Sequence, residues 1–463
     1  MINYNKLKGL IWAFLLITVS GACKKDSPGP SFSYKQYGSP FQGVPERQNA
    51  AIYQVNLRAF SEAGTFKGVE ARLDSVKALG INVLYLMPIY PVGVVNSAGG
   101  LGSPYSIKDY KAVNPEFGTL EDLRALVDAA HSKGMAVILD WVANHTSWDN
   151  EWITAHKDWY QQDNAGNVIS PPGTGWLDVA QLNYTNTELR KAMIDAMAYW
   201  VYTANVDGFR CDAADYVPYS FWKEAIESLR TIQSHKLLIL AEGGRNDHFK
   251  AGFDLLYGFN FFYTMSDKVF EEKGSVTLLQ NVNTAEYAIT PESTQRVVRY
   301  TTNHDVNLSD GTPLELFGGK QGSMSAFVVA AYMKGVPMIY NGQEIGQATR
   351  LQYFTRTPIS WNTADYGMVA EYKKLLAFYN ASNTVRMGEL RSFSSDDVCV
   401  FTKHVEGETI LVIANLRNKA VTYSVPGALV NTAWTDVFTN TSTAVSNQIS
   451  LPAYSYKVLK INQ

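Results

Sequence analysis

The sequence predicts an α/β protein whose largest part is a (β/α)8 TIM barrel, and three observations support this fold class. Short apolar runs rich in β-branched residues alternate with amphipathic stretches of helical period, as expected of βα units that feed a parallel sheet. Eight such runs are present, which is the number of strands that closes a barrel of this type. Polar residues gather at the ends of several runs, where such barrels carry their catalytic groups.

The eight runs are the expected strands, and amphipathic stretches between them are expected helices. Strands are predicted at Ala51–Val55, Val83–Pro88, Ala136–Asp140, Gly208–Asp212, Leu237–Glu242, Phe253–Tyr257, Val297–Asn303 and Pro337–Tyr340. Helices are predicted at Leu120–Lys133, Glu188–Thr203 and Phe221–Ser234 from apolar residues at three- and four-residue spacing. The alternative is an open doubly wound sheet. Such a sheet usually has a Gly-rich phosphate turn after its first strand, and Asn56-Leu57-Arg58 offers none.

Two segments depart from the βα pattern. The irregular stretch from Thr146 to Asn183 separates the third and fourth expected strands, and a loop of that length inside a barrel is usually functional. Past about residue 385, short alternating runs predict a small antiparallel β domain, with strands at Val398–Lys403, Thr409–Asn415 and Tyr454–Ile461. The expected parts are therefore barrel at 46–140, a short inserted domain at 141–183, barrel at 184–384, and a C-terminal antiparallel β domain at 385–463.

The N-terminus predicts export. Lys6 and Lys8 precede an apolar run at 10–19 that is too short to span a bilayer, which indicates a signal peptide at 1–22. The end of this segment resembles the lipobox of bacterial lipoproteins, in which Cys23 would carry the lipid. Ser20 stands where that motif usually has Leu, so simple cleavage and release stays open. Residues 23–45 would then tether the protein to the cell envelope, at the outer membrane or in the periplasm, with membrane contact through the anchor only.

Composition narrows the class of partner. The net charge is −3 and the Lys and Arg residues are scattered, so neither a nucleic-acid footprint nor a polybasic membrane patch is present. The partner is expected to be neutral. Cys211 and Cys399 lie in different expected domains at a spacing that matches no zinc pattern, and they are best explained as small buried hydrophobic residues.

Candidate catalytic residues follow the expected strands. The polar groups at the strand ends are Asp140 with Asn144 and His145, Arg210 with Asp212, Glu242, and Asn303 with His304 and Asp305. Any one of these groups alone is explained as well by a strand terminus or a helix cap. Four successive groups on one rim favour an active site, because a charge at a barrel mouth loses solvation unless it has a partner or a role.

Two of the carboxylates are expected at positions that suit glycoside hydrolysis. Retaining hydrolysis uses a nucleophile and an acid about 5–5.5 Å apart, and the ends of adjacent strands can meet that spacing. Asp212 and Glu242 end the fourth and fifth expected strands. Arg210 shares a strand face with Asp212 and would keep it ionised as the nucleophile. Glu242, which has no cation near it in sequence, is the better acid.

The motifs resemble those of glycoside hydrolase family 13, the α-amylase family, in order along the chain from about residue 50 to 463. The segments at 140–145 and 207–212 are similar to the first and second family regions, and the second implies Asp212 as the nucleophile. Glu242 follows a strand as the family's general acid/base does. Asn303-His304-Asp305 resembles the fourth region, which implies that Asp305 distorts and holds the sugar while His304 hydrogen-bonds its hydroxyls.

The resemblance extends to the surroundings of these residues. The segment at 335–344 resembles the strand-eight motif, which is structural, and the segment at 103–110 implies that Tyr105 stacks on bound glucose. His145 and Arg210 complete the implied substrate-binding set. By the same resemblance, 141–183 would be domain B and the β-rich tail domain C.

Two departures from the family pattern bear on metal and substrate. Calcium-dependent amylases continue the second region with Lys and then His, the latter a calcium ligand, whereas Asp215 and Tyr216 stand here. Asn144 and Asp178 keep oxygen donors of the type that calcium prefers, so no cofactor is expected to be required while a calcium site stays open. Ser106 replaces a His of many amylases, which loosens the match to strict starch-degrading enzymes.

The favoured function is retaining hydrolysis of α-1,4-glucosidic bonds in starch-like chains or maltooligosaccharides through a covalent glycosyl-enzyme intermediate. The alternatives within the same fold are a cyclomaltodextrinase, an α-glucosidase or a glucosyltransferase. A non-catalytic glycan-binding relative is the alternative from another class. Such relatives usually lose one of the carboxylates, whereas Asp212, Glu242 and Asp305 are all present.

Overall fold

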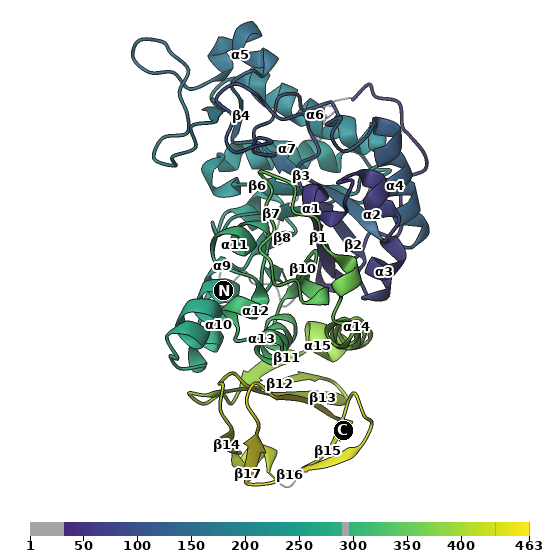
Figure 1. Ribbon diagram of the computed structural model, residues 1–463, viewed down its shortest axis with the longest axis vertical. Helices are drawn as coiled ribbons and strands as arrows, with labels where there is room; N and C mark the ends of the chain where they lie inside the picture. The colour runs from purple at the N-terminus through teal and green to yellow at the C-terminus, as the bar shows by residue number, and fades with distance from the viewer. Residues whose placement is uncertain (1–31, 289–295, 431, 463) are drawn as a thin grey trace, which may run out of the picture. The chain divides into compact units, whose positions relative to one another are not determined.

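A computed structural model of the protein describes residues 32–288, 296–430 and 432–462. The signal peptide expected at 1–22 and the expected lipidation site Cys23 lie outside these residues. Among the helices that are described, none has the length and apolar character needed to cross a membrane. The predicted fold class is confirmed: eight parallel strands form a closed barrel in the order β1-β10-β9-β8-β7-β6-β3-β2 (Figure 1).

Each barrel strand overlaps one of the predicted runs. The strands are β1 Ile52–Val55, β2 Val83–Leu86, β3 Ala136–Val142, β6 Gly208–Asp212, β7 Leu238–Ala241, β8 Leu255–Tyr257, β9 Val297–Arg299 and β10 Val336–Tyr340. Every residue in them is buried, because side chains fill the barrel on one face and helices cover the other. The strands are therefore continuously apolar apart from a few polar residues, several of which serve the site.

Several strand ends differ from their predictions by one or more residues, and two of these differences have local reasons. β3 continues to Val142, since Trp141 and Val142 still pair with the end of β6. β9 ends at Arg299 rather than at Asn303, because the chain turns toward helix α11, His304–Ser309. The side chain of Asn303 caps this helix by accepting hydrogen bonds from the N–H groups of Asp305 and Val306.

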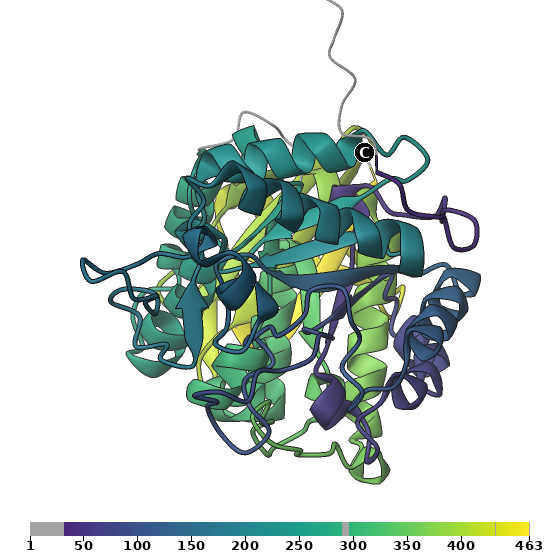
Figure 2. The ribbon, with the colours of Figure 1, turned by 90° about the horizontal axis from the view of Figure 1, so that it is seen from above.

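The helices form a ring around the strands (Figure 2). The three predicted helices are α4 Leu120–Ser132, α6 Thr187–Ala204 and α7 Tyr219–Arg230. The first two begin where Thr119 and Asn186 cap them, and α7 ends four residues before its prediction. The other helices that position the barrel are α1 Leu57–Phe60, α2 Phe66–Glu70, α3 Leu73–Ala78, α8 His248–Ala251, α9 Phe259–Tyr263, α10 Thr277–Ala288, α12 Pro313–Leu316, α13 Lys320–Tyr332, α14 Tyr366–Ala381 and α15 Asn383–Met387.

The segment inserted after β3 forms a small unit at the carboxyl ends of the strands. β4 His145–Ser147 and β5 Val179–Gln181 pair antiparallel and bring the two ends of the segment together. Helix α5 Glu151–Ala155 lies between them, and the Trp152 ring packs 5.1 Å from those of Tyr110 and Trp159. Through Tyr110, this aromatic cluster packs the inserted segment against the barrel.

The C-terminal part folds into two antiparallel sheets. The larger sheet has the order β11-β12-β13-β18-β15-β16 and the smaller pairs β14 with β17. Their bounds are β11 Glu389–Ser392, β12 Val398–Val405, β13 Glu408–Asn415, β14 Val421–Ser424, β15 Thr432–Asp436, β16 Ser442–Val445, β17 Gln448–Leu451 and β18 Tyr456–Asn462. Alternate residues of β13 serve two cores. Ile410 and Val412 pack with the barrel core, and Leu411 and Ile413 pack inside the β domain.

The described part of the segment at 23–45 lies against the barrel. The Tyr34 hydroxyl donates a 2.5 Å hydrogen bond to Asp195 of α6, and the Tyr37 hydroxyl donates one of 2.7 Å to Asp128 of α4. The Phe41 ring stacks on His131 with their centroids 4.4 Å apart. From Phe32 onward, this segment is therefore held by specific contacts with the barrel.

Candidate active site

The backbone of two neighbouring loops holds Asp212 and Glu242 in place. Asp212 is the last residue of β6, and Glu242 directly follows β7. The Ala213 N–H donates to Glu242 Oε2 at 2.8 Å, and the Ala214 N–H donates to the Glu242 carbonyl at 2.9 Å. Ala213 adopts a left-handed conformation with φ of 43°, a strained arrangement that aims its N–H at the Glu242 carboxylate. The residue that follows one candidate catalytic carboxylate thus positions the other.

Arg210 joins three carboxylates from its buried position within β6. Its Nη1 donates to Asp140 Oδ1 at 2.7 Å and to Asp212 Oδ1 at 3.0 Å, and its Nη2 forms an ion pair with Glu242 Oε1. The sequence does not indicate the contact with Glu242, because it crosses from β6 to β7. Asp212 and Glu242 bind neighbouring nitrogens of one guanidinium, which favours the separation of about 5–5.5 Å used by retaining enzymes over the wider gap of inverting ones.

The electrostatics of this cluster differ from the expectation that Arg210 keeps Asp212 ionised. Burial and the adjacent Glu242 carboxylate raise the pKa of Asp212 well above its usual range, although Arg210 lowers it. Burial also raises the pKa of Asp140 to about 6, again against the influence of Arg210. Three carboxylates therefore share one buried guanidinium, and the cluster favours retention of a proton when no ligand is bound.

Tyr105 and His304 form a hydrogen-bonded pair next to these carboxylates. The Tyr105 hydroxyl lies 2.5 Å from His304 Nε2 and donates to Asp140 Oδ2 at 3.1 Å. Gln54 Nε2 lies 2.7 Å from His304 Nδ1. Burial and the Arg210 charge lower the pKa of His304 to about 3, so its ring is neutral. A proton on Nε2 satisfies all of these contacts, since Tyr105 then accepts from His304 and donates to Asp140.

Asp305 is the most exposed of the three predicted catalytic carboxylates, with 51% of its side chain accessible. The Tyr353 hydroxyl donates to Asp305 Oδ1 at 3.2 Å, and His304 Nε2 lies 3.3 Å from Oδ2. Tyr353 belongs to the loop after β10, and no motif of the sequence had indicated it. It could have been found only from the position of its loop on the catalytic rim.

A cavity of about 200 Å³ collects most of the predicted site residues. Asp212, Glu242, Asp305, Tyr105, His145 and His304 all line it. Arg210 lies behind the carboxylates and does not line the cavity. Trp176 also lines it, and its ring lies 5.6 Å from the His145 ring. The carboxylates thus face a space walled by aromatic rings, as sugar-binding sites require.

The two oxygen donors suggested for calcium do not form an open metal site. Asn144 Oδ1 already accepts a hydrogen bond of 3.1 Å from Gln181, and its Nδ2 lies 3.2 Å from His145 Nδ1. Asp178 lines the catalytic cavity instead. In the part of the chain that the structure describes, no three His, Cys, Asp or Glu side chains gather in a metal-binding cluster. Asn144 would therefore bind a calcium ion only by giving up or sharing its hydrogen bond with Gln181.

Asp215 connects the two loops that follow Asp212 and Glu242. Its carboxylate accepts hydrogen bonds from the Gly244 N–H at 2.9 Å and the Arg245 N–H at 3.1 Å, and it lies 2.6 Å from His248 Nε2. A Cβ at Gly243 would lie 2.5 Å from the Asp215 carboxylate, so glycine is needed for this close approach. Asp215 is one of the two residues at which the sequence departs from the calcium-dependent pattern. Here its side chain links the two loops instead.

Comparison with known proteins agrees with this geometry. A family described as the α-amylase catalytic domain matches residues 41–172 and 174–373, and the C-terminal domain of maltogenic amylase matches 390–458. Alpha-amylase 3 of Dictyoglomus thermophilum is 25% identical over 485 aligned residues, which cover 90% of this chain and 94% of that protein.

Solved structures give the same result. The chain resembles an α-amylase from Lactobacillus plantarum with a TM-score of 0.81 and 30% identity, over 90% of this chain and 99% of that one. It also resembles a noncanonic maltogenic α-amylase from Thermotoga neapolitana with a TM-score of 0.79 and 27% identity, over 90% and 100% of the two chains. The barrel, the residues on its rim and the extent of these matches show that the chain belongs to the α-amylase family of glycoside hydrolases.

Proposed function

We propose that this protein hydrolyses α-1,4-glucosidic bonds of starch-like chains or maltooligosaccharides with retention of configuration. The observation that carries the proposal is the binding of Asp212 and Glu242 to one buried guanidinium at the wall of an aromatic-lined cavity. Two carboxyl groups so placed supply the nucleophile and the acid that retaining hydrolysis needs.

The reaction proceeds in two displacements. Asp212 attacks the anomeric carbon while Glu242 gives its proton to the departing glycosidic oxygen, so a glycosyl ester forms as the glycosidic bond breaks. Glu242, now ionised, takes a proton from water, and that water replaces Asp212 at the same carbon.

The remaining residues hold the sugar. Tyr105 offers its ring to the face of the glucosyl unit, and His304 and Asp305 hydrogen-bond its hydroxyls as the ring distorts. Because Tyr105, His304 and Asp140 already form one hydrogen-bonded chain, these groups are fixed before substrate arrives. Groups that are already in position can stabilise the transition state more strongly than the bound substrate, which raises the rate of the chemical step.

The test is a substrate panel with anomer detection. Purified protein is incubated with soluble starch, pullulan, cyclodextrin and maltose, and products are resolved by size and by the NMR signals of the first-formed anomer. We expect α-anomers of short maltooligosaccharides. First-formed β-anomers would contradict the retaining mechanism, and binding without turnover on every substrate would favour the non-catalytic alternative.

The small size of the catalytic cavity favours the alternatives within the family that act on substrates shorter than a polymer. About 200 Å³ is a narrow space for a polymer, and the tail matches the C-terminal domain of maltogenic amylase. A cyclomaltodextrinase, α-glucosidase or glucosyltransferase would use the same carboxylates. Faster conversion of cyclodextrin than of starch would assign the first of these, and products longer than the substrate would assign transfer.

The proposed location is the bacterial cell envelope, through lipid on Cys23. The support is the sequence at 1–23, in which a charged start, an apolar run and small residues precede the cysteine. A Cys23→Ala variant should move from the membrane fraction to the soluble fraction on cell fractionation. Unchanged membrane association would contradict the lipid anchor.

The activity is proposed to be independent of calcium. Asn144 is hydrogen-bonded to Gln181, and Asp215 and Tyr216 replace the residues that precede and provide the calcium ligand in the resembled pattern. Dialysis against EDTA should leave both the turnover rate and the melting temperature unchanged. A loss of either that added calcium restores would overturn this expectation.

A further inference from the structure

Arg58 is buried in α1, directly after β1, and every N–H group of its guanidinium donates a hydrogen bond. Nε and Nη2 donate to the Glu116 carboxylate, at 3.2 and 3.0 Å. Nη1 donates to the carbonyls of Gly102 at 2.6 Å and Tyr353 at 2.5 Å, and Nη2 donates to that of Leu101 at 2.9 Å. One guanidinium thus joins the segment after β2 to the loop after β10.

The two joined segments also contact each other directly. The Leu101 N–H donates to the Phe354 carbonyl at 2.8 Å. A Cβ at Gly99 would lie 2.7 Å from the Phe354 Cβ, and Gly99 has a φ of 70°, so this close approach requires glycine. Segments that are far apart in the sequence therefore meet on the rim of the barrel.

The meeting segments form one end of the catalytic cavity, which we call the end wall. Four of their residues line the cavity and make up this wall: Ala98, Ser103, Tyr353 and Phe354. The Tyr353 hydroxyl donates to Asp305 at 3.2 Å, and its ring lies 6.1 Å from that of Tyr105. The end wall therefore stands beside residues that are proposed to hold the glucosyl unit.

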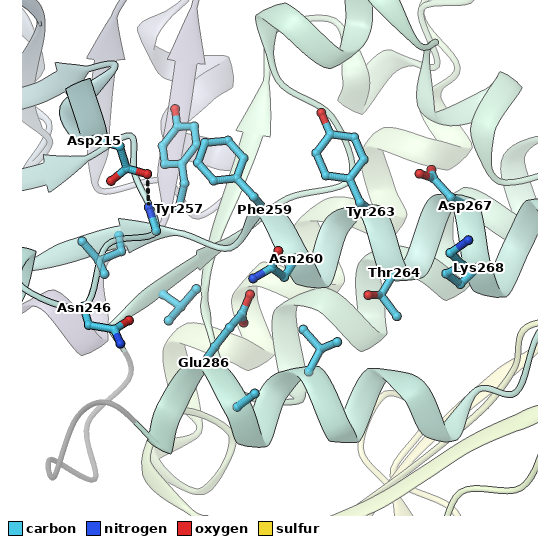
Figure 3. Close-up of a pocket in the computed structure, with 15 residues that line it drawn as sticks. Asp215, Asn246, Tyr257, Phe259, Asn260, Tyr263, Thr264, Asp267, Lys268 and Glu286 are labelled. Atoms are coloured by element: carbon cyan, nitrogen blue, oxygen red, sulfur yellow. Dashed lines mark hydrogen bonds between the residues drawn. The ribbon is translucent and has the colours of Figure 1, made fainter.

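The acid lies on the opposite side of the barrel mouth. In the closed order β1-β10-β9-β8-β7, the strand that precedes Glu242 is four strands from the one that precedes Arg58, which is half of the barrel. A cavity of about 630 Å³ adjoins that side, and Figure 3 shows Asp215, Tyr257 and Tyr263 in its wall. The site thus borders free space near the acid and is bounded by the end wall across from it.

The direction of the substrate follows from the chemistry of the reaction. The acid protonates the oxygen of the departing unit, so the departing part of the chain lies on the side of Glu242. The unit that Asp212 attacks is linked to the rest of the chain through its O4, which is across the sugar ring from the anomeric carbon. The chain toward the non-reducing end therefore extends away from Glu242 and toward the end wall.

We propose that the end wall, held in place by Arg58, makes the protein act from the non-reducing ends of glucan chains. The wall stops the chain, so only a terminal segment fits between it and the cleaved bond, and the product is a short sugar of fixed length. Arg58 is a positioning residue, because it holds the wall through main-chain carbonyls and does not line the cavity. The inference rests on the proposed function for the reaction and adds the chain end at which hydrolysis begins.

The experiment compares maltoheptaose with maltoheptaose that carries a 4,6-O-benzylidene cap on its non-reducing end. The cap adds bulk only at the end that would meet the wall. The wild type should hydrolyse the capped sugar with a kcat/KM about 100-fold lower, because the cap and the wall cannot occupy the same space. Chromatography of the products measures both rates. Values of kcat/KM that agree within twofold would overturn the proposal and leave the proposed function intact.

Two variants weaken the wall in different ways. Phe354→Ala removes a ring from it, and Arg58→Lys keeps a charge for Glu116 but cannot donate to three carbonyls at once. Each should raise kcat/KM for the capped sugar relative to the uncapped one roughly tenfold. A merely structural role of Arg58 would lower the melting temperature and both rates together, with the ratio unchanged, and would overturn its assignment. Phe354→Ala leaves the Arg58 contacts intact and tests the wall even if Arg58→Lys does not fold.

The matched control is Arg356→Gln. Arg356 binds the same Glu116 carboxylate at 3.4 Å from an exposed position, and it does not line the cavity. In the part of the chain that the structure describes, its side chain has no bond to the carbonyls that Arg58 holds. The ratio of the two kcat/KM values should therefore stay at that of the wild type. A ratio raised as much as by Arg58→Lys would show that loss of a Glu116 partner, rather than of the wall contacts, causes the change.

A binding measurement separates failure of this inference from failure of the proposed function. Both sugars are titrated into Asp212→Asn protein, and binding is followed by calorimetry. The capped sugar should bind roughly tenfold more weakly, and Phe354→Ala in the same background should remove the difference. This result supports the end wall even if no substrate is turned over. Equal affinity for the two sugars overturns it even if wild-type hydrolysis is normal.

Discussion

Arg210 is the residue on which the chemistry of the site depends. Its side chain is fully buried and serves Asp140, Asp212 and Glu242 together. The rings of Tyr85, Tyr105 and Tyr257 lie 5.8, 5.9 and 5.5 Å from its guanidinium carbon. Aromatic faces around a cation exclude water while they stabilise its charge. The guanidinium can therefore remain buried and hold Asp212 and Glu242 in one fixed geometry.

Replacement of Asp212 by Asn tests the nucleophile directly. The amide keeps the shape of the side chain and still accepts from Arg210, but it cannot form the glycosyl ester, so turnover should fall at least about 10⁴-fold, comparable with loss of other covalent nucleophiles. The far-UV circular dichroism and the melting temperature should stay close to those of the wild type. Near-normal turnover on maltooligosaccharides would remove Asp212 from this role.

Glu344 gives the protein a predictable pH dependence of stability. It is buried in the loop after β10, its Oε1 accepts a 2.6 Å hydrogen bond from Tyr53, and burial raises its pKa from 4.5 to about 7. Since the folded state holds this proton more tightly than the unfolded state, the stabilisation is fully present below pH 4.5 and is lost as the pH rises through about 7.

The variant Glu344→Gln removes this titration while it keeps an acceptor for Tyr53. The free energy of unfolding of the wild type, relative to the variant, should therefore decrease by about 3 kcal/mol between pH 4.5 and a pH above 7. Urea unfolding at a series of pH values measures it. Glu389→Gln, at an exposed position of β11, is the control and should leave the pH profile as it is. Parallel profiles for wild type and Glu344→Gln would refute the assignment.

At the scale of elements, the loops after β6 and β7 behave as one unit. Ala213 and Ala214 hold Glu242 through their N–H groups, and Asp215 holds the chain after Glu242 through Gly244, Arg245 and His248. Both loops must also approach closely at Gly243. The spacing between Asp212 and Glu242 is therefore set by contacts between loops as well as by the pairing of β6 with β7.

Asp215→Ala should lower kcat for maltohexaose about 10- to 100-fold with little change in KM, because a small misplacement of Glu242 affects the transition state more than substrate binding. Asp215→Asn keeps an acceptor for the two N–H groups and should recover most of the loss. Asp247→Ala is the control, since Asp247 pairs with Arg245 in the same loop without reaching the β6 loop. A purely structural role would instead lower the melting temperature of Asp215→Ala while kcat stayed normal.

At the scale of the whole molecule, the C-terminal β domain is packed onto the barrel by apolar and polar contacts. The Ser325 hydroxyl of α13 donates to the Tyr454 carbonyl at 2.8 Å. Arg417 follows β13 and donates to the carbonyls of Val269 and Gly274 at 2.6 and 2.5 Å, besides pairing with Asp397 at 2.7 Å. Val269 and Gly274 lie in and after the π-helical segment Thr264–Glu271, which continues from α9. The β domain thus supports the helix that carries Tyr263.

Arg417→Met should destabilise the protein by about 2–4 kcal/mol, since it leaves two barrel carbonyls and Asp397 without their buried charged donor. The midpoint of thermal unfolding measures this loss. Arg391→Met on β11 removes an exposed arginine that stacks on the Phe393 ring 5.0 Å away, and it should have little effect. Equal midpoints for the two variants would show that Arg417 does not hold the domains together.

The sequence by itself determined the fold class and most of the site. The β-branched runs are strands because their residues are buried on both faces, and that burial is visible as continuous apolar character at Ala136–Leu139 or Leu238–Ala241. The strand-end carboxylates could be found because parallel strands bring all their carboxyl ends to one rim. The predicted strand boundary was wrong near Asn303, where the side chain caps helix α11. The hydrogen bonds of a single capping residue leave no periodic pattern in the sequence, so such a boundary cannot be predicted from periodicity.

Only the tertiary structure decided how these residues act on one another. Arg210 binds Glu242 as well as Asp212, Tyr353 contacts Asp305, and Asp215 bridges two loops, although each pair joins segments that are separate in the sequence. The raised pKa of Asp212 likewise depends on burial and on Glu242, which belongs to the next strand of the barrel. Charge, solvation and distance are properties of the folded arrangement, so the residue types indicate the chemistry while the packing of neighbouring strand ends determines its geometry.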